Sequence, residues 1–161
     1  MTAARAAAPT NAFTRLAVRA LAGVASRGAR RVAVLIFHRV TPVPDPLFPH
    51  EMDAGRFDAT MAALAASFHV LPLWEAVTRM RDGTLPPRAA AITFDDGYAD
   101  NHDVALPILR RHGLPACFFI ATGFLGGGRM FNDTVIECVR NSSLDEVDLG
   151  AFGLGPVVLG G

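Results

Sequence analysis

The chain has 161 residues, of which 51% are hydrophobic and 19% charged, a composition typical of a globular domain rather than a disordered segment. Its formal net charge is zero, which gives no general reason to expect a nucleic-acid partner. There is no lysine, so the sequence excludes sites built on a lysine, such as a P-loop or a Schiff base.

Residues 1–31, the first predicted part of the chain, are rich in alanine and arginine. Three interpretations compete: a helix that covers the base of the domain, which we favour; a helix in weak contact with an anionic membrane surface; and a targeting segment. Arginines interrupt every candidate apolar core of a secretory signal. We therefore expect a location in the cytoplasm or at the cytoplasmic face of the membrane, with an extracytoplasmic location left open.

The second predicted part, residues 32–161, begins with a strand. Residues 31–37 are continuously apolar after Arg31, a pattern that predicts a fully buried strand, and His38 follows at its end. A lone histidine in such a place is more often structural than catalytic. The prolines within residues 41–51 predict a loop, and we expect His50 and Asp53 to be solvated loop residues.

Helical and strand patterns then alternate, which predicts parallel strand–helix units and an α/β fold. Trp74 is expected to lie in the core rather than serve as a platform for a sugar. No convincing element follows Asn141. The predicted elements are, in order, helix 56–67, a short strand from Val70, helix 73–81, strand 89–94, helix 100–112, strand 116–121 and helix 132–140.

Two adjacent carboxylates, Asp95 and Asp96, follow the strand 89–94, and Gly97 comes next. The carboxyl ends of strands are where α/β folds place their chemistry. Paired carboxylates there are costly unless a metal, hydrogen bonds or a shared proton compensates them. A solvated turn explains a bare Asp-Asp-Gly equally well, because these residues are common in turns.

The flanking residues favour the chemical interpretation. Thr93-Phe94-Asp95-Asp96-Gly97-Tyr98 resembles the first signature of the polysaccharide deacetylases, the NodB-homology carbohydrate esterases. The resemblance runs from about His38 to about Arg140, with its core from about residue 88. It implies an α/β fold that is a partial, distorted (β/α) barrel with parallel strands. A full barrel takes about 250 residues, so we expect a truncated domain.

The resemblance also implies a reaction, the metal-dependent hydrolysis of N-acetyl or O-acetyl groups on a polysaccharide or oligosaccharide. The implied cofactor is a divalent metal, expected to be Zn²⁺. By the resemblance, Asp95 is the general base and Asp96 a metal ligand. The backbone N–H of Tyr98 is expected to stabilise the oxyanion, and His38 to contact the substrate or lie near the metal.

The histidines depart from the family pattern. The family completes its metal site with a His-(Ser/Thr)-x-x-His motif, and no two histidines here have that spacing. Catalytic zinc usually needs three protein ligands, so we expect an incomplete site. His102 and His112 are expected to be surface residues. Two alternatives to the deacetylase stay open: a truncated or non-catalytic fragment or glycan-binding module, and, more weakly, a Mg²⁺-dependent phosphoryl-transfer pocket at Asp95 and Asp96.

Overall fold

The computed structural model of the protein describes residues 31–159. The N-terminal segment therefore lies outside the described residues except for Arg31, and its helix and its membrane contact stay predictions. The described residues belong to two compact units that divide between Ala121 and Thr122, each with its own sheet. Within residues 31–159, no helix has the length and apolar character needed to cross a membrane.

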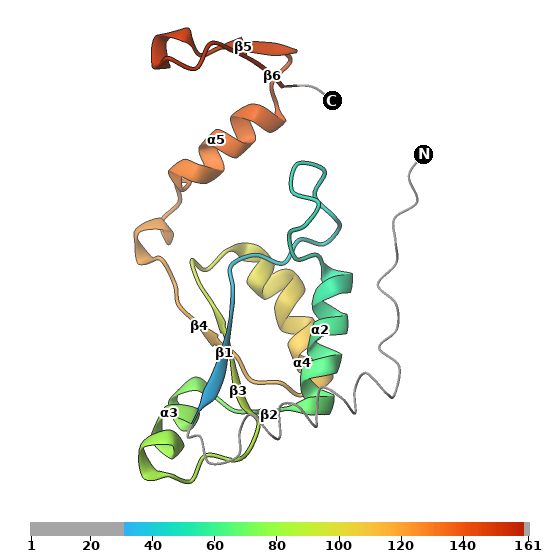
Figure 1. The fold of residues 1–161 in the computed structure, drawn as a ribbon, viewed down its shortest axis with the longest axis vertical. Helices are drawn as coiled ribbons and strands as arrows, with labels where there is room; N and C mark the ends of the chain where they lie inside the picture. Colours follow the sequence, from blue (N-terminus) through green and yellow to red (C-terminus); the bar gives the residue numbers. More distant parts are fainter. Residues whose placement is uncertain (1–30, 160–161) are drawn as a thin grey trace. The chain divides into compact units, whose positions relative to one another are not determined.

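The first unit is built on a parallel sheet with β3 at its centre (Figure 1). β1 (Val32–Phe37) pairs along the whole length of β3 (Ala89–Phe94). The other edge of β3 is shared, because β2 (His69–Val70) pairs with its first two residues and β4 (Cys117–Phe118) with its last two. Every β3 residue is buried, which explains the continuous apolar run. Parallel strands joined through helices confirm the predicted α/β class.

One face of this sheet is covered by α2 (Ala54–Ser67) and α4 (Leu106–His112), which lie side by side (Figure 1). Aromatic rings fill the space between them and the strands. The Phe94 ring stacks on those of Phe37 and Phe118, with centroids 5.4 and 4.9 Å apart. The buried core consists of Val40, Phe57, Met61, Leu64, Ile92, Phe94, Ala105, Ile108 and Leu109. These contacts hold the carboxyl ends of β1, β3 and β4 together.

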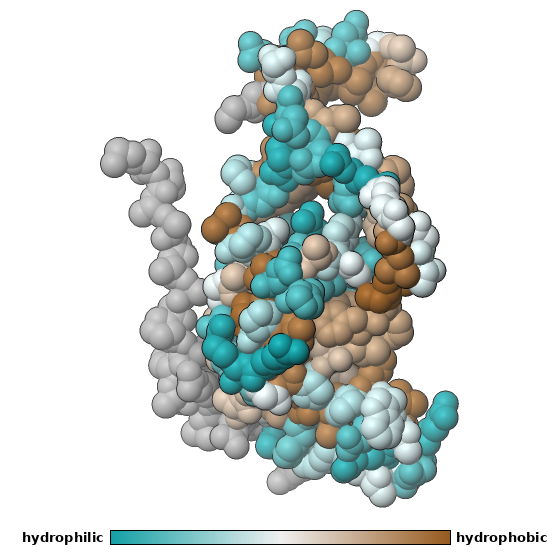
Figure 2. Space-filling model, turned by 180° about the vertical axis from the view of Figure 1, so that it is seen from behind, coloured by the Kyte–Doolittle hydropathy of each residue, from teal (hydrophilic) through white to brown (hydrophobic). Residues whose placement is uncertain are grey.

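The opposite face of the sheet carries the alternate side chains, because neighbouring residues of a strand point to opposite faces. The prediction of a fully buried strand at residues 31–37 is therefore wrong: in β1, Leu35 and Phe37 pack against the core, whereas Val34 and Ile36 are exposed because no described element covers that face. Phe119, which follows β4, is exposed as well. Figure 2 shows hydrophobic side chains reaching the surface among hydrophilic ones. In the part of the chain that the structure describes, β1 pairs with β3 alone, so one edge of this sheet is open.

The sequence predictions for Asp53 and Trp74 are wrong. Asp53 is buried rather than solvated, and its Oδ1 atom accepts hydrogen bonds from the N–H groups of Gly55 (2.8 Å) and Arg56 (3.0 Å). It is therefore the N-cap of α2, which begins two residues earlier than predicted. Trp74, in α3 (Leu73–Asp82), is 71% exposed, and the residue that α3 buries is Ala76.

The predicted helix 100–112 consists of two pieces. Asn101–Ala105 form a π-helical turn, η1, in which the N–H of Leu106 donates to the carbonyl of Asn101. Pro107 lies in the first turn of α4, a position where proline is tolerated. His102 is exposed as predicted, but the prediction for His112 is wrong: its ring is largely covered, and Nε2 lies 2.7 Å from Oδ1 of Asp58.

The second unit contains the predicted helix, α5 (Phe131–Arg140), and an element that the sequence analysis missed. β5 (Glu146–Asp148) and β6 (Pro156–Val158) form a two-stranded antiparallel sheet. Gly153 and Gly155 adopt positive φ between the strands, a conformation that glycine reaches without strain. The prediction that no element follows Asn141 is therefore wrong.

Candidate functional site

The Asp-Asp-Gly segment forms a tight loop at the carboxyl end of β3. The N–H of Asp95 donates to the carbonyl of Phe37 at 2.9 Å, so Asp95 still belongs to the sheet's hydrogen-bond pattern. The backbone then turns, and Asp96 and Gly97 have φ values of +72° and +77°. A non-glycine residue in the left-handed region stores strain, which is common at functional sites. The carbonyl of Asp96 accepts from the N–H of Ala121, which ties the loop to the chain after β4.

Gly97 is the residue that makes this turn feasible, for two reasons. Its φ lies in the region where side chains are disfavoured. A Cβ atom there would also lie 2.9 Å from Cδ1 and 3.1 Å from Cγ2 of Ile120. The loop therefore packs closely against the segment after β4, and glycine is required by both conformation and space.

His38 and Asp95 become neighbours through the register of β1 and β3. Ile36 pairs with Thr93, so the residues two positions further along, His38 and Asp95, fall on the same face of the sheet. Nε2 of His38 lies 3.9 Å from Oδ2 of Asp95. This distance allows electrostatic interaction but exceeds that of a direct hydrogen bond. Both side chains are solvent-accessible, so a substrate can reach them.

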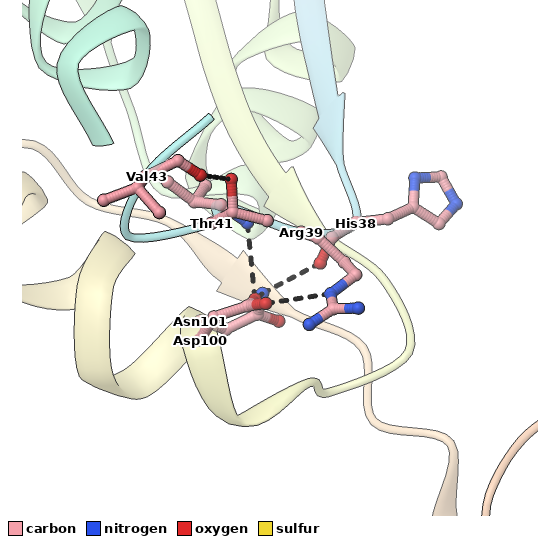
Figure 3. A network of polar contacts seen from close by, with 7 residues as sticks. His38, Arg39, Thr41, Val43, Asp100 and Asn101 are labelled. Atoms are coloured by element: carbon pink, nitrogen blue, oxygen red, sulfur yellow. Dashed lines mark hydrogen bonds and ion pairs between the residues drawn. The ribbon is translucent and has the colours of Figure 1, made fainter. Parts of the chain in front are cut away.

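A second set of polar contacts joins the end of β1 to the helix after the loop (Figure 3). Nε of Arg39 lies 2.9 Å from Oδ2 of Asp100, and the N–H of Val40 donates to Oδ1 of Asp100 at 3.3 Å. Nδ2 of Asn101 donates to the carbonyl of His38 at 2.8 Å. The Arg39 guanidinium also lies over the Tyr98 ring, 4.7 Å from its centroid. In Figure 3 the His38 ring points away from these contacts.

A cavity of about 270 Å³ opens beside the loop. Most of its wall is apolar, and the buried residue Asn101 contributes a polar part. The Oδ1 atom of Asn101 has no hydrogen-bond partner within residues 31–159. The cavity is lined by Gly97, Tyr98, Ala99, Asn101, His102, Leu106, Phe118 and Ile120.

The described residues do not form a complete metal site. Among residues 31–159, no three side chains of histidine, cysteine, aspartate or glutamate lie close enough together to hold an ion. Asp96 is a carboxylate of the kind that binds zinc, but a catalytic zinc site usually has three protein ligands. The structure therefore leaves the prediction of Asp96 as a metal ligand untested.

The structure thus brings together two of the four predicted site residues, His38 and Asp95, and keeps Asp96 and Tyr98 on the same loop. Sequence reasoning gave no role to Arg39 and Asp100. Both residues are charged and lie close in sequence to predicted site residues. This closeness was the only feature of the sequence that could have indicated a role for them. The pairing itself spans 61 positions and could not be deduced from spacing.

Comparisons with known proteins find similarity to polysaccharide deacetylases. Residues 82–142 match the family model described as polysaccharide deacetylase. A solved structure of a de-N-acetylase from Aggregatibacter actinomycetemcomitans is 27% identical, with a TM-score of 0.52 over 60% of this chain. The IcaB structure from Ammonifex degensii is 25% identical, with a TM-score of 0.51 over 61% of this chain.

A third structure, the deacetylase PplD of Streptococcus pyogenes in complex with acetate, is 23% identical, with a TM-score of 0.51 over 57% of this chain, and supports the fold alone. The chain spans 40%, 41% and 43% of the de-N-acetylase, IcaB and PplD chains, respectively. No curated protein is significantly similar to the chain. The match of residues 82–142 to the family model and the similarity to these solved structures confirm the predicted resemblance to the polysaccharide deacetylases.

Proposed function

We propose that this chain contributes to the hydrolysis of N-acetyl, or O-acetyl, groups on a polysaccharide or oligosaccharide. The observation that carries the proposal is the Asp95–Gly97 loop, which lies at the carboxyl end of the central strand and inside the region matched by the family model. The left-handed backbone at Asp96 supports it, because strained backbone is common at functional sites. The solved structure that is 27% identical to this chain is that of a de-N-acetylase.

The proposed architecture is an open part of a distorted (β/α) barrel. In support, the strands of the first unit are parallel, α2 and α4 lie on one face, and that face holds the aromatic core. The other face carries exposed apolar side chains of β1, as the interior of a barrel would. Residues at the carboxyl ends of the strands then surround the substrate, which is where His38 and Asp95 lie.

In the proposed reaction Asp95 is the general base. Water attacks an amide carbonyl poorly unless a base removes its proton, and a carboxylate within reach of the water can do so. Asp95 is accessible, and His38, 3.9 Å away, is positioned to contact the same substrate. The backbone N–H of Tyr98 follows the turn and is assigned to the oxyanion that forms as water adds to the carbonyl.

Asp96 is assigned to a divalent metal, with Zn²⁺ as the expected ion. Bound zinc would polarise the carbonyl and acidify a water molecule. The described residues alone do not provide three ligands, so they do not fit a complete site, and no step of the reaction is assigned to the ion. What these residues contribute is the base, a substrate contact and one carboxylate for the metal.

The alternative is a NodB-like fragment or module that binds glycan without hydrolysis. The incomplete ligand set within residues 31–159 favours this alternative. Both candidates share the carbohydrate partner and differ in whether acetate is released.

The test uses the full chain with a panel of N-acetylated and O-acetylated oligosaccharides of different linkage. Acetate release and glycan retention in affinity electrophoresis are measured on the same samples, with and without added Zn²⁺. Acetate that increases with protein concentration supports the deacetylase, and retention without acetate supports the binding module. If neither is observed on any glycan of the panel, both candidates are wrong.

A further inference from the structure

We infer that Arg39, Asp100 and Asn101 act as positioning residues, which hold the end of β1 against the Asp95–Gly97 loop and thereby set the approach of His38 to Asp95. The inference rests on the proposed function for its meaning, since these residues lie beside the predicted site. The contacts that these residues make are the observations that support it.

Asp100 is the centre of the arrangement. Its side chain is only 9% exposed, and a carboxylate so covered is costly unless it is paired and hydrogen-bonded. Each of its two oxygens has a partner: Oδ2 lies 2.9 Å from Nε of Arg39, and Oδ1 accepts a hydrogen bond from the N–H of Val40 at 3.3 Å. Both partners belong to the segment just after β1. Asp100 therefore fixes that segment against the start of η1.

Asn101 fixes the residue that carries the imidazole. Its Nδ2 donates to the carbonyl of His38 at 2.8 Å and to Oδ1 of Asp100 at 3.2 Å. Both partners are acceptors, so the amide can face them only with its nitrogen, and its orientation is determined. The backbone of His38 is thereby held at a defined position opposite Asp95.

Arg39 links the same segment to the loop itself. Besides pairing with Asp100, its guanidinium lies over the ring of Tyr98, the residue that directly follows Gly97. A cation over an aromatic ring is favourable, and arginine can stack and form an ion pair at once. The turn at Asp96 and Gly97 has left-handed backbone, which needs surrounding contacts to persist. Arg39 supplies one of these contacts from a different strand.

The alternative is that Arg39 stabilises the fold as a whole rather than the site. The exposure of Arg39 argues against this alternative. Arg39 is 47% exposed, so its removal leaves no cavity in the core. Arg56 offers a matched control: it is 46% exposed and also pairs with a largely buried carboxylate, that of Asp53, but far from the loop in sequence. If Arg39 is a positioning residue, its substitution makes the loop and the end of β1 open more often, while the rest of the fold stays intact.

The test is amide hydrogen exchange by NMR on the full chain, for wild type, Arg39→Met, Arg39→Lys and Arg56→Ala. The reporters are the N–H groups of Val40 and Gly97, and the buried N–H of Ile92 is the reference for global opening. We expect Arg39→Met to accelerate exchange at Val40 and Gly97 by about tenfold or more, with Ile92 unchanged. Arg39→Lys, which keeps the charge but cannot stack on Tyr98 and pair with Asp100 at once, should restore part of the protection.

Three results would overturn the inference: no acceleration in Arg39→Met, equal acceleration at Ile92, or the same effect in Arg56→Ala. Because Arg39 lies over the Tyr98 ring, we expect an upfield shift of the Arg39 side-chain protons in the wild type, and this shift provides a spectroscopic check. Acetate release is measured separately. Its absence in the wild type would refute the proposed function, while the exchange rates would still decide the positioning role.

Discussion

Gly97→Ala is expected to destabilise the first unit by about 2–4 kcal/mol, because two separate costs add. An alanine at φ +77° pays about 1–2 kcal/mol for left-handed backbone. Its Cβ would also lie 2.9 Å from Cδ1 of Ile120. Displacing that side chain costs about 1–2 kcal/mol, the lower part of the range for overpacking, because Ile120 is exposed and can rotate.

The two costs can be separated with other glycines of this chain. Gly113 has φ +63° and no atom within 4 Å of an added Cβ, so Gly113→Ala pays the backbone cost alone, about 1–2 kcal/mol. Gly123 has open space and no left-handed φ, so Gly123→Ala is expected to change stability by less than about 0.5 kcal/mol. In an Ile120→Ala background, Gly97→Ala should lose its contact cost and fall to the level of Gly113→Ala.

The assay is urea unfolding followed by far-UV circular dichroism. The single tryptophan, Trp74, is a poor fluorescent reporter because it is exposed in the folded state. The reasoning is refuted if Gly97→Ala is as stable as Gly123→Ala, or if the Ile120→Ala background leaves the cost of Gly97→Ala undiminished.

Three further predictions concern single side chains. Asp53→Ala should lower the free energy of unfolding by about 1 kcal/mol, because the N-cap of α2 is lost; an unchanged urea midpoint would contradict this. Asp96→Gly should raise the free energy of unfolding by about 1 kcal/mol, since glycine relieves the strain at φ +72°; a lower midpoint would contradict the strain. Hydrogen bonds from His112 and then Arg111 hold the pKa of Asp58 below its usual value of 3.8. A carboxyl whose pKa is lowered by folding stabilises the fold at pH values above its unfolded pKa, and this contribution is lost as the pH falls through its folded pKa. Wild type should therefore lose more stability than Asp58→Asn between about pH 5 and pH 3. Parallel profiles of stability against pH for the two proteins would contradict the pairing.

The central strand and its loop could be predicted from the sequence because the signals there are local. A continuous apolar run predicts a strand buried on both faces, and β3 is such a strand. Gly97, directly after the two aspartates, likewise indicates the turn locally, because glycine allows the backbone to turn sharply. By contrast, the cap at Asp53 was missed because a short polar residue in a proline-rich loop looks the same whether or not a helix begins beside it.

Features that depend on distant contacts could not be predicted. The exposure of Trp74 is set by what lies opposite α3, not by its helical position. β5 and β6 are three residues each, too short for their alternation to stand out among glycines. The pairing of Arg39 with Asp100 joins two segments through the fold, and the sequence contains no spacing rule that connects them.

The central claim is that the Asp95–Gly97 loop is the site of an acetyl hydrolysis. The most direct measurement is the rate of acetate release by the full chain, compared between wild type, Asp95→Asn and Asp103→Asn. Asp103 is an exposed carboxylate of the same unit that pairs with His102 and is not among the residues that line the cavity beside the loop. We predict that Asp95→Asn reduces the rate by about 100-fold or more and that Asp103→Asn stays within about twofold of wild type. Equal rates for wild type and Asp95→Asn, or no acetate from wild type, would contradict the claim.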